Sequence, residues 1–168
     1  MEIAGEDECV GFLRDCLKVF SISQKVYIHI SYYNLPKSIL GRVNADIEII
    51  KKKRFYGIFK QYTVTNISRK IKGKEFYIKI NSIFLQIENR DIREEVVKSI
   101  IIHELLHIER NDLIETSKNY KMRKHKRIHR SLEKEAFLRM NLLRKVEGLK
   151  ELDNKNYIER EISNLIKN

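Results

Sequence analysis

The sequence has little of what disulfide-stapled, proline-rich or metal-thiolate proteins need. It has no tryptophan, one proline and two cysteines in 168 residues. Cys9 and Cys16 lie seven positions apart on a segment with helical periodicity, which separates them by about 10 Å along the helix axis, too far for a disulfide. No Cys-x-x-Cys pair is present either. We therefore expect two reduced thiols in a cytoplasmic protein.

Long apolar runs are also missing. The longest uninterrupted apolar stretch has only a few residues, whereas a helix that crosses a bilayer needs roughly 20. Met1 is followed by acidic residues and not by a basic and then an apolar stretch, so we expect no signal peptide. Internal repeats and low-complexity linkers are absent from the sequence. We therefore expect one domain over residues 1–168, without membrane insertion.

Charge is what the sequence has in abundance. Charged residues make up 34% of the chain and hydrophobic residues 42%, a composition typical of a globular protein with a heavily charged surface. The net charge is +11, which favours anionic partners: nucleic acid, an acidic protein or an anionic membrane surface. The alternative is a basic but otherwise ordinary surface.

Hydropathy patterning predicts an α+β domain with a zincin-like order of elements. A helix is expected over residues 6–20 and a capping box at Asp91 and Glu94. Further helices are expected from Ile92 through His107, over 125–146 and in the tail 149–168. Alternating residues predict strands over 26–32, 43–50, 55–65 and 75–80, with turns at 51–54 and 66–74. This arrangement gives a small antiparallel or mixed sheet within about 26–80, followed by helices over about 91–147.

One short motif carries chemistry. His103-Glu104-Leu105-Leu106-His107 reads His-Glu-x-x-His within an otherwise apolar run. Histidines four apart share a helix face, so two imidazoles can take two corners of a zinc tetrahedron. Glu104 then stands where it can act as general base toward a zinc-activated water. An ionised glutamate in so apolar a helix would be costly without such a partner, which disfavours the alternative of an exposed surface helix.

A catalytic zinc usually has a third protein ligand. Four downstream residues are candidates on or near the second long helix: His125, His129, Glu133 and Glu135. Glu135 also suits a surface ion pair with Arg139, one helical turn later. Periodicity alone does not choose among the four.

Two family resemblances bear on this ligand. The His-Glu-x-x-His motif with a later Glu133-Lys134-Glu135-Ala136 resembles the gluzincins, including archaeal minigluzincins and ImmA/IrrE-type peptidases. That resemblance implies a zinc metallopeptidase in which Glu133, 26 residues after His107, is the third ligand. Phe137 stands where such families usually carry Asp or Asn.

The competing resemblance is to SprT-like peptidases. Segment 76–102, a strand and short loop leading directly into the metal helix, is similar to theirs, and the similarity covers about residues 75–145. It implies His125 as the third ligand. The aromatic residue expected four positions later is here His129, and Lys126 replaces a frequent glycine.

A basic stretch follows the motif in sequence. We expect it to form an electropositive rim that recruits nucleic acid or acidic polypeptide. The rim residues are Lys121, Arg123, Lys124 and Arg127. Both resemblances imply action on or near nucleic-acid-associated proteins. The sequence thus predicts a cytoplasmic zinc metallopeptidase with one catalytic ion and a polypeptide substrate. The alternative is a DNA-associated regulator that keeps the zinc site with little or no proteolysis.

Overall fold

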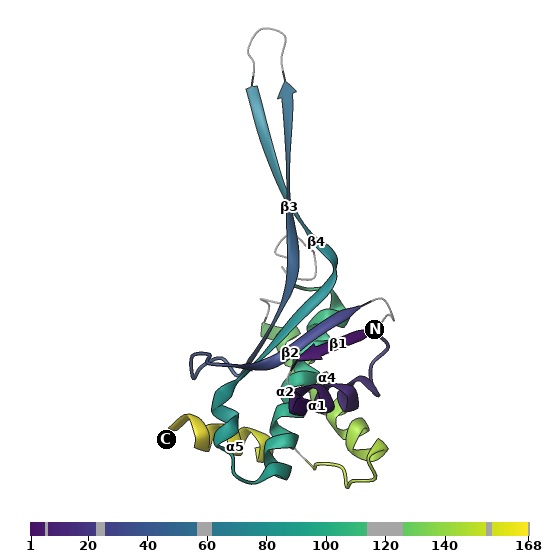
Figure 1. Ribbon diagram of the computed structural model, residues 1–168, viewed down its shortest axis with the longest axis vertical. Coiled ribbons are helices and arrows are strands. Elements are labelled where there is room, and N and C mark those ends of the chain that lie inside the picture. The colour runs from purple at the N-terminus through teal and green to yellow at the C-terminus, as the bar shows by residue number, and fades with distance from the viewer. Residues whose placement is uncertain (6, 23–25, 57–61, 114–125, 154–155, 168) are drawn as a thin grey trace.

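The computed structural model describes the chain except for residues 6, 23–25, 57–61, 114–125, 154–155 and 168. The described part is an α+β fold, as expected (Figure 1). Its four strands are β1 (Glu2–Gly5), β2 (Tyr27–Tyr33), β3 (Gly41–Tyr56) and β4 (Tyr62–Asn81). Its helices are α1 (Asp7–Leu17), the 3-10 helix η1 (Ser82–Gln86), α2 (Arg90–Arg110), α4 (Lys126–Val146) and α5 (Asn156–Lys167).

The sheet is mixed, in the order β1-β2-β4-β3. Strands β1, β2 and β4 run parallel, and β3 pairs antiparallel with β4 as an edge strand. Alternation along the strands buries one face of the sheet, because Ile28, Ile30 and Ile78 are at most 1% exposed while Tyr27 and Tyr77 face outward. Helices α1 and α2 pack on the buried face.

The two long strands correct the predicted turns. Residues 51–54 lie inside β3 and residues 66–74 inside β4, so the described parts of the three expected strands 43–50, 55–65 and 75–80 belong to two long strands. A run of lysines is compatible with a strand whose pairing partner supplies the backbone hydrogen bonds, and lysine has no intrinsic turn geometry. Gly73, which suggested a turn, lies opposite the register shift between Ala45 and Ile47.

Helix α2 is the buried centre of the helical layer. Its residues from Val96 to Ile108 are buried except Ser99 and His103, as the apolar sequence predicts. The predicted capping box is wrong. Asn89 caps the helix, because its side-chain oxygen accepts hydrogen bonds from the backbone N–H groups of Asp91 and Ile92.

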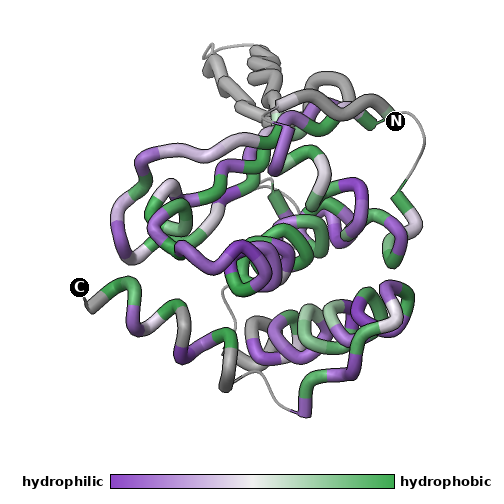
Figure 2. Tube along the Cα trace, turned by 60° about the horizontal axis from the view of Figure 1, so that its bottom comes forward, coloured by the Kyte–Doolittle hydropathy of each residue, from purple (hydrophilic) through white to green (hydrophobic). Residues whose placement is uncertain are grey.

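The two C-terminal helices are amphipathic, and Figure 2 shows hydrophobic and hydrophilic segments alternating along α5. In α4, Leu132, Met140 and Leu143 are buried, whereas Leu142 and Val146 are exposed. The buried positions are eight and three residues apart, which keeps them on one side of the helix. Ile158 of α5 belongs to the same core, and α5 packs against α2 and η1.

Cys9 and Cys16 form no disulfide, as expected, and both are fully buried. Burial raises the pKa of the Cys16 thiol well above its ordinary value. Among the described residues, no helix combines the length and the apolar character that a membrane span requires.

Candidate metal centre

The two motif histidines converge on α2. The Nε2 atoms of His103 and His107 are 3.3 Å apart, and the two rings lie nearly perpendicular. The His103 side chain is 26% exposed and that of His107 10%, so the pair opens to solvent on the His103 side. One helical turn separates the two residues, which brings their imidazoles together as the spacing predicts.

Asp112 holds the second histidine. Its carboxylate oxygens lie 2.9 and 3.0 Å from Nδ1 of His107, and the residue is only 4% exposed. The chain reaches this position because Asn111 ends α2 in the left-handed region, with φ of 51°, and turns the next residue back toward the helix. A proton on Nδ1 then donates to the carboxylate, which leaves the lone pair of Nε2 directed toward His103.

Asp112 is not among the candidate residues predicted from the sequence. It directly follows the C-cap residue Asn111, so its carboxylate lies near the last turn of α2, which contains His107. An acidic residue just after the end of a helix is the sequence signal that could identify such a partner for a histidine in that turn.

Helix α4 brings one of the four candidate ligands to the histidines. The Glu133 Oε1 atom lies 3.3 Å from Nδ1 of His103. Glu135 is engaged elsewhere, 2.5 Å from Arg110 and 3.7 Å from Arg139. His125 lies outside the described residues, and His129 lies in the first turn of α4, where side chains are not described.

The catalytic candidate Glu104 is buried beneath the start of the edge strand. It is 7% exposed. A Cβ atom added at Gly41 would lie 3.4 Å from Glu104 Oε1 and 2.4 Å from Ile100 Cγ2. The backbone of β3 therefore passes directly over this carboxylate, and only glycine leaves room for that approach.

Gly41→Ala is expected to destabilise the protein by about 1–3 kcal/mol, because the new methyl group overlaps the branched side chain of Ile100. Thermal and denaturant unfolding measure this loss. Gly11→Ala is the matched control. Gly11 lies within α1 with nothing within 4 Å of an added Cβ, so it should gain up to about 1 kcal/mol. Equal effects of the two substitutions would contradict the close passage of β3 over α2.

The residues present fit a zinc ion. Bonds of about 2.0–2.1 Å in a tetrahedron place two ligand nitrogens about 3.3–3.4 Å apart, and the two Nε2 atoms are 3.3 Å apart. Imidazole nitrogens are among the ligands that zinc prefers, and a carboxylate on Nδ1 of a ligating histidine is its usual outer partner. Glu133 is the nearest described candidate for a third ligand, although it contacts the Nδ1 edge of His103 and not Nε2.

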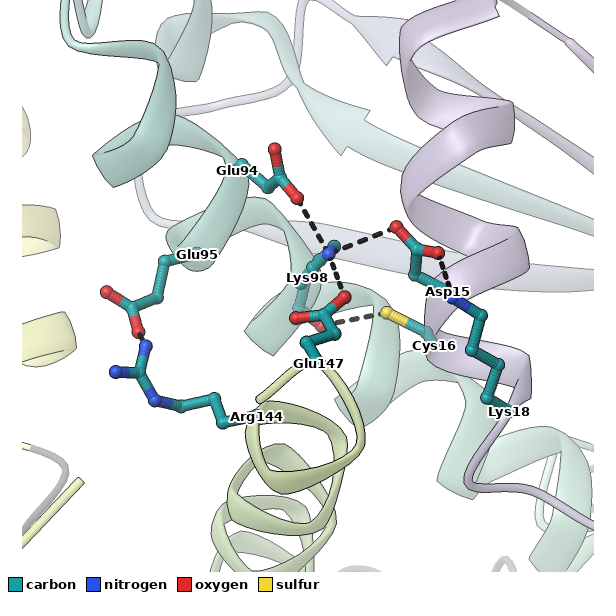
Figure 3. Close-up of polar contacts among 8 residues, drawn as sticks. All are labelled: Asp15, Cys16, Lys18, Glu94, Glu95, Lys98, Arg144 and Glu147. Carbon is teal, nitrogen blue, oxygen red and sulfur yellow. Dashed lines mark hydrogen bonds and ion pairs between the residues drawn. The ribbon is translucent and has the colours of Figure 1, made fainter. Parts of the chain in front are cut away.

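A second group of possible donors has another explanation. Carboxylate oxygens of Asp15, Glu94 and Glu147 lie within 4.8 Å of one another. The buried ammonium of Lys98 lies 3.1, 2.7 and 2.5 Å from these three carboxylates in turn, joining α1, α2 and the end of α4 (Figure 3). The lysine already supplies the positive charge that a cation would bring, so this group is a structural ion-pair cluster.

The predicted basic rim cannot be placed beside the site: Lys121, Arg123 and Lys124 lie outside the described residues, and the Arg127 side chain is likewise not described. Strand β4 is internal to the described sheet, because it pairs with β2 on one side and β3 on the other.

Comparison of the chain with family models, curated proteins and solved structures finds no significant match.

Proposed function

We propose that this chain is a zinc-dependent metallopeptidase. The observation that carries the proposal is the 3.3 Å approach of the His103 and His107 Nε2 atoms on a buried helix. In this proposal the two histidines hold the ion, and Glu133 would complete the protein ligand set by turning from the Nδ1 edge of His103 toward the ion. A bound zinc ion would supply a Lewis acid to the scissile carbonyl and acidify a water.

The side chains of this chain would then perform the proton transfers. Glu104 accepts a proton from the attacking water and delivers it to the leaving amine, which balances the hydrolysis of one peptide bond. Its low exposure of 7% keeps bulk water from competing for that proton. Asp112 keeps the proton of His107 on Nδ1, so that Nε2 remains a ligand.

The edge strand suggests how substrate is held. β3 is the last strand of the described sheet, and its first residues, from Gly41 to Ala45, lie beside the helix that carries Glu104. An extended polypeptide can add to such an edge through main-chain hydrogen bonds, with little demand on its sequence. An unfolded or extended polypeptide is therefore the proposed substrate. The two buried thiols suit the cytoplasmic setting that we also propose.

Zinc content tests the proposal directly. The purified chain should hold one zinc ion, measured by elemental analysis, and His103→Ala and His107→Ala should each lose it because two of the ligands are these imidazoles. His29→Ala is the matched control. That ring stacks on Tyr77 on the sheet, so its loss should leave zinc content unchanged. A wild-type chain that binds no zinc would rule out the metallopeptidase.

The same measurement distinguishes the role of the outer carboxylate. Asp112→Ala is expected to weaken zinc binding about 10–100-fold in a chelator competition, since His107 loses the group that orients it. Asp112→Asn should recover part of the affinity because its amide oxygen still accepts the Nδ1 proton. Asp153→Ala, an exposed position, should change nothing. Unchanged affinity in Asp112→Ala would remove Asp112 from the site.

A further inference from the structure

The outer half of the β3–β4 pair forms a ribbon of its own. From Ile47 opposite Ile71 to Tyr56 opposite Tyr62, the two strands pair without interruption. Strand β2 pairs with β4 only over Glu75–Asn81, so this part lies beyond the register of the other strands. Figure 1 shows it extending away from the helices. We name residues 47–71 the basic arm.

The name follows from its composition. The 25 residues of the basic arm include seven lysines and arginines and one acidic residue, Glu48, which gives a net charge of +6. The whole chain carries +11, so the other 143 residues contribute only +5. More than half of the net charge is thus concentrated in about one seventh of the chain.

The register distributes these cations over both faces of the ribbon. Residues directly opposite share a face, and successive residues alternate between faces. One face receives Lys51, Lys53 and Arg69. The alternate face receives Lys52, Arg54 and Lys70. Both faces of the ribbon therefore carry cations. A ribbon that binds one flat anionic surface would need cations on one face only.

This arrangement is unfavourable for the isolated chain. A two-stranded ribbon without a third strand or a packed helix is marginally stable in water. Lys70 lies opposite Glu48, but Lys51 and Lys53 share one face of β3 and Lys52 and Arg54 share the other, so like charges repel along this strand and weaken the ribbon further. A polyanion that lies against both faces would remove the repulsion and add favourable contacts. The basic arm therefore has the properties of an element that is stabilised by a partner.

We infer that the basic arm binds duplex DNA in the major groove. Ten paired residues at about 3.3 Å each span about 33 Å, close to one turn of B-form DNA. The major groove, about 12 Å wide, accepts a two-stranded ribbon, and its two walls are lined by phosphates that face both sides of the ribbon. A membrane surface would engage one face only, and the major groove of duplex RNA is too narrow.

Fluorescence anisotropy with a labelled 24-base-pair duplex tests this inference on the full chain. The test variant replaces Lys51, Lys52, Lys53 and Arg54 by glutamine. We expect its affinity at low salt to fall at least tenfold. The slope of log affinity against log salt should also decrease by about 3, because three or four phosphate contacts are lost. A second variant, with Arg69→Gln and Lys70→Gln, should lose affinity from the opposite strand.

The matched control removes the same charge elsewhere. Lys37, Arg90, Lys145 and Lys150 are exposed positions off the arm, and replacing all four by glutamine should leave most of the affinity. Equal losses in test and control variants would mean that only total charge matters, and would overturn the inference. So would a wild-type chain that ignores duplex DNA, or one that prefers vesicles of anionic lipid or polyglutamate. Zinc content and proteolysis are measured separately, so this outcome is independent of the proposed enzyme.

Discussion

Glu104→Gln is expected to lower the hydrolysis of an unfolded polypeptide such as labelled casein by about 100- to 10,000-fold. This is the range that a positioned general acid–base contributes. The amide has nearly the shape of the carboxylate but accepts no proton at neutral pH. Glutamine should fit the same buried place beneath β3, where the residue is 7% exposed. Zinc content should therefore stay at the wild-type value while turnover disappears.

A second glutamate on the same helix is the control. Glu109 lies near the end of α2 and pairs with Arg139, away from the two histidines, so Glu109→Gln should keep full activity. Cleavage that survives in Glu104→Gln would show that another group moves the proton. A wild-type chain that holds zinc but cleaves no unfolded polypeptide would favour the regulator, in which the site serves to hold the metal.

Lys98→Met should destabilise the fold by about 3 kcal/mol at neutral pH. The side chain of Lys98 is 3% exposed and bonds three carboxylates from three helical segments. Removing one partner of a buried ion pair leaves the other charges without compensation, which is far costlier than losing a surface pair. Denaturant unfolding measures the difference. Lys18→Met is the control, because Lys18 is half exposed where it bonds Asp15, and such pairs are worth at most about 1 kcal/mol.

The pH dependence of this loss follows from the cluster. Burial would raise the pKa of Asp15, but Lys18 and Lys98 hold it below its ordinary value of 3.8. Its contribution is therefore present above about pH 4 and is lost as pH falls through the lower, folded-state pKa. Burial alone would lower the pKa of Lys98, but its three carboxylates raise it, so its contribution lasts until pH rises beyond the ordinary 10.5. The difference between wild type and Lys98→Met should be greatest between these limits and shrink in acid.

The helices and strands that were predicted correctly from the sequence are those that are buried on one face or on all sides. α2 was identified by its apolar run, and the inner strands by alternation at Ile28 and Ile78, because core packing imposes those periods. The sequence did not predict the length of β3 and β4. Residues 51–54 are four consecutive charged residues, with neither the alternation typical of a strand nor a typical turn residue, so only their cross-strand pairing decides their conformation. That pairing is non-local and leaves no mark within a short window of sequence.

The candidate site shows the same division. His103, Glu104 and His107 follow from spacing along one helix, which is local information. Glu133 reaches His103 from α4, and sequence could offer it only as one of several candidates because the packing of two helices selects it. Asp112 was missed because its role depends on the backbone turn at Asn111. Residues whose position depends on tertiary packing or on a single backbone dihedral angle cannot be predicted from the periodicity of the sequence.

The register shift between Ala45 and Ile47 divides β3 and β4 into an inner part and an outer part. The length of each part can vary independently of the other. On its inner side, Gly41 and the strand beside Glu104 are fixed by contact with α2. On its outer side, the two strands pair only with each other in the described register, so residues can be added or removed there without moving the histidines. Removal of two residues from each strand keeps every remaining side chain on the same face of the ribbon. Removal of one residue moves the side chains beyond it to the opposite face. The length of the ribbon can therefore change without any change in the candidate metal site.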